Sequence, residues 1–468
     1  MTEFSFTQSF ESVTIRVALG VIAAGLLYVL VKEVQKIPAK LFALMATAFV
    51  DMVGVLMVIP LLPFYVKQLE GAGFEILGMR VGVGLISGFI VSAFTVAQLL
   101  SAPIWGRFSD RFGRRPALLI ALGSSALAYL IFGFANSLFL LFLSRVVQGA
   151  GGGTVGVIQA YVADTTEPEN RARALGWLSA ATNLGVALGP VLGSLSVRLG
   201  EVDVLPGTGT LRMGHAAPGL AAAVLCLCNI AFAAKYLVES RQTHHEDSAH
   251  PRRSPRQALW RVFTHSGEPS SRLIWIYSIA IGAFQGITAV LALFLNARFH
   301  VDEKTIGFFF MYIGAISVFT RVLLLGRAVD RLGESRLSQI GIITLAVGVG
   351  TMPIAGSIGV LAVSVALIPL GTAFTFPCVT ALLSRVISPA DKGLYMGLQQ
   401  TFGGVARIVA PLLYGWLFDW WGIGVPFYFS AAFVLATIFL GLGLDRFARP
   451  RVGPAPALVS SPSSPNPP

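Results

Sequence analysis

Long apolar stretches alternate with short polar connections over most of the chain. A transmembrane helix needs about 20 predominantly apolar residues, and twelve stretches come close to that length. They cover residues 41–66, 81–105, 116–135, 138–163, 174–196, 217–238, 273–296, 305–325, 337–355, 358–383, 394–417 and 423–445. The pattern predicts an all-α membrane protein with twelve transmembrane helices.

Composition agrees with this interpretation. Hydrophobic residues make up 55% of the chain and charged residues 12%, against about 25% charged residues in soluble domains. The net charge of +11 does not indicate a nucleic-acid partner, because the basic residues are spread among short connections. The connection 106–115 holds four arginines, whereas those near 135–137 and 355–357 are uncharged. Basic residues gather on the cytoplasmic side of membrane proteins, so we expect both ends of the twelve-helix unit to face the cytoplasm.

One polar loop occurs twice. Residues 106–115 read GRFSDRFGRR and residues 326–335 read GRAVDRLGES, each after a long apolar segment. Further on, a second set of residues recurs at a constant offset of 221: Pro168, Arg171, Gly176 and Pro190 return as Pro389, Lys392, Gly397 and Pro411. The repeat predicts two pseudo-symmetric six-helix bundles, 41–238 and 271–447, joined by a cytoplasmic linker, 239–270. Paired bundles of this kind can rock around a central site, which points to transport.

Two flanking segments lie outside the repeat. Residues 1–40 form an N-terminal extension with an apolar segment, Val17–Val31, which we expect to be an extra helix. It either spans the membrane or lies in its interface, and the sequence favours neither. The Pro/Ser-rich tail, 448–468, is expected to be disordered.

The repeated loop resembles the cytoplasmic loop signature of the major facilitator superfamily. Its glycines permit sharp turns, and its acid can cap or pair at a helix end. The resemblance implies a gating role, and we expect charge pairing near the seam between the bundles to latch them together. The gating candidates are Gly106, Asp110, Arg111, Gly113, Arg114 and Arg115 in the first copy, and Asp330 and Arg331 in the second.

Two ionisable residues within apolar spans are candidates for proton coupling. Arg145 lies in LFLSRVVQGAG, which resembles the fourth-helix motif of the superfamily, whose arginine is implicated in proton transfer. The alternative is that Arg145 snorkels or satisfies backbone carbonyls. Asp51 lies in AFVDMVGVLMVIPLLP, which is similar to the first-helix motif of the twelve-span drug:proton antiporters. Burial disfavours a charged carboxylate, which suits proton exchange; the alternative is a structural acid that hydrogen-bonds a neighbouring helix.

The fifth apolar stretch carries a row of small residues: Gly176, Gly185, Gly189, Pro190 and Gly193. Glycines four residues apart form a flat face for close helix packing, and proline bends a helix. The spacing looks like the antiporter motif of superfamily exporters, and we expect this face to seal the bundle interface. Ordinary packing within a bundle is the alternative.

The run from Phe42 to Gly193 is similar to the tetracycline efflux proteins. This resemblance implies a secondary transporter, not an enzyme, that exports a small amphipathic drug-like compound such as a tetracycline in exchange for protons. The second half departs from the pattern, because Glu334 and Ser335 replace the paired arginines and the third, ninth and tenth spans lack acids. An uptake symporter or facilitator of a small metabolite remains the alternative, and a non-transporting receptor would need a binding domain beyond this linker and tail.

Polar and aromatic side chains within spans are candidates for binding substrate. They are Gln98, Asn183, Gln285, Phe374, Gln400 and Arg407. Interhelical hydrogen bonding is the alternative fate for the polar ones, and Arg407 either holds an anionic group or pairs with carbonyls near Pro411. Histidines in the linker are irregularly spaced and no nucleotide motif occurs, so no metal or cofactor is expected. We expect a monomer in a bacterial inner membrane whose partners are substrate, protons and lipid.

Overall fold

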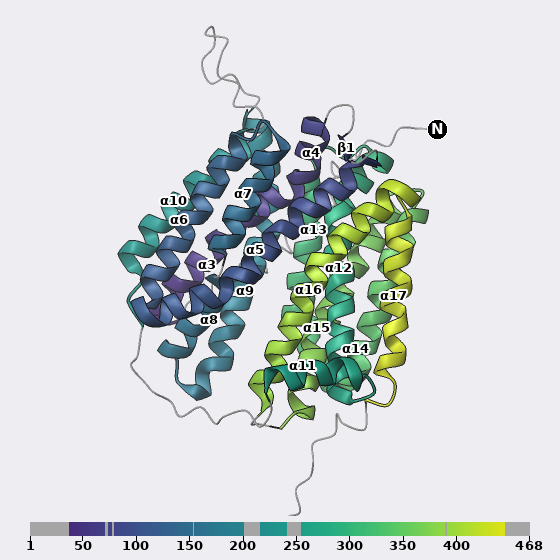
Figure 1. The fold of residues 1–468 in the computed structure, drawn as a ribbon. Helices are drawn as coiled ribbons and strands as arrows, with labels where there is room; N and C mark the ends of the chain where they lie inside the picture. Colours follow the sequence, from purple (N-terminus) through teal and green to yellow (C-terminus); the bar gives the residue numbers. More distant parts are fainter. Residues whose placement is uncertain are drawn as a thin grey trace, which may run out of the picture.

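A computed structural model describes residues 37–70, 74–76, 79–152, 154–200, 216–240, 254–388 and 391–444. Two groups of helices stand side by side, one from each half of the chain (Figure 1). The apolar segment Val17–Val31 and the tail 448–468 lie outside the described residues.

The first group contains six spans, two of which are interrupted. The first span runs through α3 (Ala39–Val58), a 3₁₀ turn at Ile59–Leu61 and α4 (Leu62–Glu70). The turn contains Pro60, which has no amide hydrogen to donate within a helix. The fourth span consists of α7 (Leu138–Gly151) and α8 (Thr154–Thr165). The uninterrupted spans are α5 (Val83–Phe112), α6 (Arg114–Gly133), α9 (Pro168–Gly200) and α10 (Ala217–Tyr236).

The second group repeats this arrangement. It comprises α12 (Pro269–Phe299), α13 (Ile306–Phe319), a π-helical turn at Thr320–Leu324, α14 (Leu325–Thr351), a 3₁₀ turn at Met352–Ile354, α15 (Ile358–Val386), α16 (Lys392–Trp421) and α17 (Val425–Gly441). Gly333 adopts φ 76° and ψ 160° inside α14 and divides it between two spans.

The twelve predicted spans are therefore present. Among the described residues, ten helices are long and apolar enough to cross a membrane. One of them, Ile306–Ile354, holds two spans on either side of Gly333. The 17-residue helix α17 completes the set.

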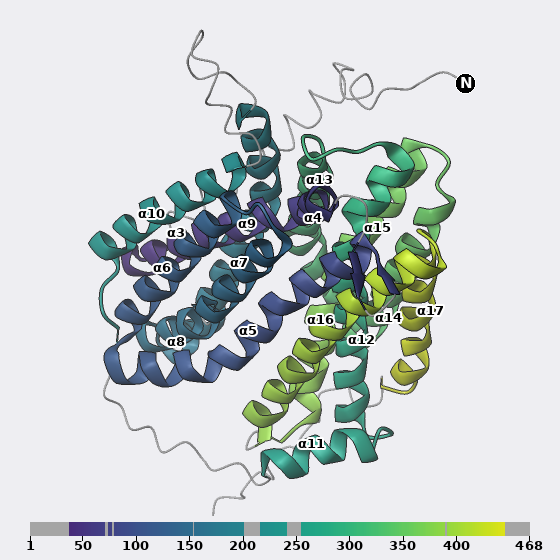
Figure 2. The same cartoon turned by 45° about the horizontal axis from the view of Figure 1, so that its top comes forward.

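Two elements were not anticipated from the sequence. Strands β1 (Phe74–Ile76) and β2 (Met79–Val81) form a short antiparallel hairpin before α5. Helix α11 (Pro255–Thr264) lies within the predicted linker and runs across the end of the second bundle (Figure 2). Ser254 and Gln257 form a capping box at its start, and Ala258 and Val262 are buried. Ten residues are too few to predict a span, so the linker's polar composition concealed this helix.

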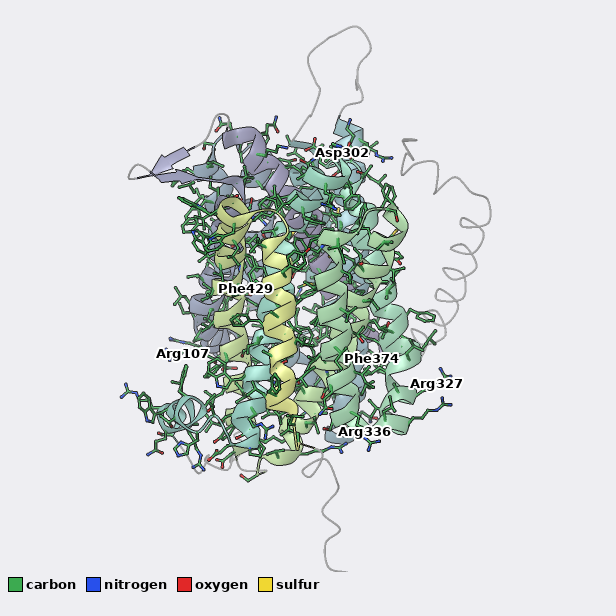
Figure 3. All side chains as sticks on the ribbon, turned by 90° about the vertical axis from the view of Figure 1, so that its right-hand side faces the viewer. Arg107, Asp302, Arg327, Arg336, Phe374 and Phe429 are labelled. Carbon is green, nitrogen blue, oxygen red and sulfur yellow. The ribbon has the colours of Figure 1, made fainter. Side chains whose placement is uncertain are left out.

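The two bundles meet along two equivalent seams. Helix α5 packs on α16, and α9 packs on α13. Figure 3 places Arg107, Arg327 and Arg336 towards one end of the bundles and Asp302 at the other. We call the first end, with the loops 106–115 and 326–335, the loop side, and the opposite end the far side. The bundles approach each other on the far side, whereas α8 and α11 stand apart on the loop side (Figure 1).

Candidate transport cavity

A cavity of about 590 Å³ lies between the two bundles. It is lined by most of the polar candidates from the sequence: Asp51, Gln98, Arg145 and Asn183 from the first bundle, and Gln285, Gln400 and Arg407 from the second. Apolar side chains such as Val55 and Phe94 form the rest of its wall. A second cavity of about 470 Å³ shares Gln98, Gln400 and Arg407 and extends to Gly106 and Asp110. The central cavity therefore continues towards the loop side, and in this conformation the cavity is accessible from that side.

Phe374 does not line this cavity. Its side chain, 8% exposed, packs in a small apolar cluster with Leu337 and Cys378, between α15 and α14. A substrate in the central cavity would not contact it. Helix α15 is apolar on most faces, so its sequence did not show which side faces the cavity.

Asp51 occupies the middle of α3 and is only 7% exposed. Its Oδ1 atom is buried and has no hydrogen-bond partner among the described residues. A buried ionised carboxylate without a partner costs several kcal/mol. The neutral, proton-bound form of Asp51 therefore fits this conformation.

Arg145 is the largest fully buried side chain among the described residues, at 1% exposure. Its guanidinium donates to Gln148 and to Ser144 and lies over the ring of Phe132, 5.4 Å from the centroid. Its second terminal nitrogen, Nη2, is buried and has no hydrogen-bond partner among the described residues. Arg145 thus lies deep in the bundle and does not snorkel to an interface.

A hydrogen-bonded chain leads from Arg145 towards the helix of Asp51. Gln148, which accepts from Arg145, donates to the hydroxyl of Tyr129 at 2.9 Å. That hydroxyl packs against Gly54, where a Cβ atom would lie 2.9 Å from it. Gly54 is one helical turn from Asp51, so this polar chain joins α7 to α6 and ends in packing contact with α3.

The first copy of the repeated loop is tied together by charge. Arg114 pairs with Asp110 at 2.5 Å and with Asp164 at 3.0 Å. Glu239 accepts hydrogen bonds from the backbone amides of Arg114 (2.8 Å) and Arg115 (3.2 Å), at the start of α6. Asp110, Arg114, Arg115 and Asp164 belong to the first bundle, and Glu239 closely follows its last helix. In this conformation the pairs do not bridge the seam as a latch between the bundles would.

The second copy of the loop preserves the geometry but reverses the charges. Gly113 (φ 107°) and Gly333 (φ 76°) both adopt a backbone that favours glycine. At the position equivalent to Arg114, Glu334 pairs with Arg385 at 2.6 Å. Arg385 in turn is equivalent to Asp164 at the repeat offset of 221. The ion pair is thus retained with its signs exchanged, while Asp330 and Arg331 are exposed.

The glycine stripe of α9 faces α3 within the first bundle. Cβ atoms on Gly185 and Gly189 would lie 2.7 Å from the carbonyl oxygens of Phe49 and Val53, and one on Gly193 would overlap the carbonyl of Met57. Gly176 has nothing near it. The stripe therefore holds α9 close to α3 and does not face the seam, which a different side of α9 forms with α13.

With this geometry established, comparison with known proteins identifies the family. The sequence matches the Major Facilitator Superfamily over residues 44–324 and 322–466. The chain belongs to the major facilitator superfamily. It is a multi-pass secondary transporter that takes a small-molecule substrate within the membrane, and not an enzyme.

Relatives within the superfamily include drug-resistance proteins. The chain is 28% identical to multidrug resistance protein 2 of Bacillus subtilis, covering 89% of this chain and 96% of the relative. It is 26% identical to the class D tetracycline resistance protein of Salmonella ordonez, covering 79% and 87%. Among solved structures, the human organic anion transporter MFSD10 (TETRAN) is similar with a TM-score of 0.60 and 25% identity, covering 86% and 99%.

Several contact residues of this superfamily member were missed by sequence reasoning. Gln148 follows Arg145 by three residues on the same helix face, which is a signal for pairing. Asp164 could have been found by comparing the halves, because Arg114 and Glu334 differ in sign and so do Asp164 and Arg385. No local pattern singles out Tyr129, whose position depends on how α6 packs against α3 and α7.

Proposed function

We propose that this transporter exports small amphipathic, drug-like compounds in exchange for protons, across a bacterial inner membrane with its loop side in the cytoplasm. The observation that carries the proposal is Asp51: a buried carboxyl, unpaired at Oδ1, in the cavity between the bundles. A neutral carboxyl can stay there unpaired, whereas its ionised form needs a cation or water. Loss or gain of one proton at Asp51 therefore changes the electrostatics of the substrate cavity.

Competition between proton and substrate follows from this placement. Asp51 and Arg145 line the same cavity without an ion pair between them. An ionised Asp51 favours a cationic substrate group or Arg145 as partner, and protonation removes that attraction. Proton binding thus weakens substrate binding, which is the coupling that an antiporter requires.

The cavity lining suits an amphipathic molecule. Its wall combines apolar side chains with a few amides and Arg407, an arrangement typical of sites for small organic ligands. The basic loop residues on the loop side support a cytoplasmic orientation. Relatives named for multidrug and tetracycline resistance support export as the direction and such compounds as substrates.

Direction and coupling can be tested in one assay. Proteoliposomes with an imposed pH gradient are supplied with tetracycline or a cationic dye, and accumulation is measured. We expect accumulation against its own gradient on the proton-rich side, loss of it in Asp51→Asn, and normal rates in Asp302→Asn. Asp302 is an exposed acid on the far side that accepts from Thr305 in its own bundle. Accumulation on the proton-poor side would instead indicate uptake symport, and transport by Asp51→Asn at the wild-type rate would remove Asp51 from coupling.

A further inference from the structure

A carboxylate from one bundle caps a helix of the other bundle on the far side. Helix α5 begins after Gly82, which has no side chain to cap the first turn. Asp419, near the end of α16, accepts from the backbone amides of Gly84 (3.0 Å) and Leu85 (2.7 Å). These are the N2 and N3 amides that an N-cap side chain normally satisfies. Asp419 therefore replaces the missing cap from across the seam.

The other seam has the same device in neutral form. Helix α13 begins after Thr305, whose side chain makes no capping bond to it. The hydroxyl of Ser194, near the end of α9, accepts from the amide of Gly307 at 2.9 Å and donates to the carbonyl of Glu303 at 2.8 Å. Gly307 is the N2 residue of α13, as Gly84 is of α5. Each bundle thus caps one helix of the other.

Glycines allow the helices to approach closely enough for these caps. A Cβ atom on Gly84 would lie 2.8 Å from the carbonyl oxygen of Gly415, and one on Gly88 would overlap the carbonyl of Pro411. At the second seam a Cβ atom on Gly307 would overlap the carbonyl of Pro190. Pro190 and Pro411 are equivalent positions of the repeat. The caps and the backbone contacts therefore exist only while the far side is closed.

We propose that Asp419 is the charged gating residue of the far side, which it closes together with Ser194 by capping helices across the two seams. The proposal rests on alternating access in this superfamily member and on neither the direction nor the substrate of transport. Asp419 carries the stronger cap, because its carboxylate engages two amides and the positive end of the α5 dipole. When the bundles separate, water replaces the lost partners, so the caps bias the far side towards closure without locking it.

Distances between spin labels on the far side test this gate. Leu199 and Ile423 are exposed and lie on different bundles, so both are replaced by labelled cysteines. The exposed Cys228 becomes serine, while Cys226 and Cys378 are buried. We expect Asp419→Asn to raise the ratio of separated to closed bundles about tenfold, because asparagine keeps one acceptor oxygen for the two amides and removes the negative charge from the positive end of the helix dipole. The measurement involves no substrate, so it is independent of the proposed export.

Ser194→Ala provides the second arm. We expect a shift of about threefold, because a neutral cap is weaker. The double variant should show the product of the two shifts, since both caps break in the same movement. Asp302→Asn removes another far-side acid and should leave the distances unchanged. If Asp419→Asn does not fold, Ser194→Ala alone decides.

Two results would overturn the proposal. One is a distance distribution unchanged by Asp419→Asn in folded protein, or by Ser194→Ala where only that variant can be measured. The other is an equal shift in Asp302→Asn, because any loss of negative charge on the far side would then suffice. Asp419→Glu keeps the carboxylate on a longer side chain and should restore part of the closed population, whereas a shift as large as that of Asp419→Asn would contradict a role for the charge.

Discussion

Adding one methyl group at Gly189 should separate two helices that the structure holds in close contact. The added Cβ would lie 2.7 Å from the Cβ of Leu56 and 2.7 Å from the carbonyl oxygen of Val53, where ordinary contact is 3.4–4 Å. One of these atoms belongs to the backbone of α3, so no rotamer change relieves the overlap. Gly176 lies in the same helix with nothing within 4 Å of its own added Cβ. Alanine at these two positions makes a matched pair of variants.

The expected difference between the variants isolates the overlap. Replacing glycine by alanine inside a helix gains about 0.8–1 kcal/mol, and this gain is common to both. Overpacking a well-packed site costs typically about 1–3 kcal/mol, and only Gly189→Ala incurs it. The free energy of unfolding should therefore be about 1–3 kcal/mol lower for Gly189→Ala than for Gly176→Ala.

Thermal unfolding of the purified, detergent-solubilised protein measures this difference. A domain of 150–250 residues changes its midpoint by roughly 2–4 °C per kcal/mol, so we expect Gly189→Ala to unfold at least about 2 °C below Gly176→Ala. Equal midpoints would refute the contact between the glycine stripe and α3. They are the result expected of a stripe that faces lipid.

Three further sets of variants test individual contacts. Glu334→Arg and Arg385→Glu should each lower the free energy of unfolding by less than about 1 kcal/mol, because Arg385 is 49% exposed, and the double reversal should recover it; additive losses would contradict the ion pair. Phe374→Ala should lower the unfolding free energy by about 3–5 kcal/mol but leave the substrate Kd unchanged by calorimetry, whereas Gln285→Ala should weaken binding; the reverse pattern would place Phe374 in the site. Gln148→Leu leaves a buried guanidinium and a buried hydroxyl without this partner, which should lower the free energy of unfolding by about 1–3 kcal/mol. We also expect it to slow proton-driven transport in liposomes roughly tenfold, and an unchanged rate would remove the polar chain from coupling.

The spans and the repeat could be predicted because they depend on local properties. Apolar length determines whether a helix can span the bilayer, and the loop glycines are required by backbone conformation at Gly113 and Gly333. The same reasoning collected most of the polar residues of the cavity, because polar side chains in a span avoid lipid. It placed Phe374 incorrectly, because a phenylalanine side chain is equally compatible with the cavity wall, with lipid and with the protein core.

Contacts between distant helices could not be predicted in the same way. The spacing of Gly185 and Gly189 indicates a flat face but not which helix packs on it. Asp110 was expected at the seam, whereas in this conformation its partner is Arg114, because the bundles are apart on the loop side. Asp419 lies near the end of a helix, where acidic residues are common, so the sequence alone does not indicate that it contacts another helix. Its role depends on the start of α5, 335 positions away.

The central claim is that proton movement and drug export are coupled through Asp51. Its most direct test is proton flux driven by a drug gradient alone. Proteoliposomes enclosing a pH-sensitive dye receive a tetracycline or cationic-dye gradient with no initial pH difference. We predict that protons move opposite to the drug in the wild-type protein and in Asp302→Asn, and that Asp51→Asn shows no proton movement. Proton movement in the same direction as the drug, or unchanged countermovement in Asp51→Asn, would contradict the account.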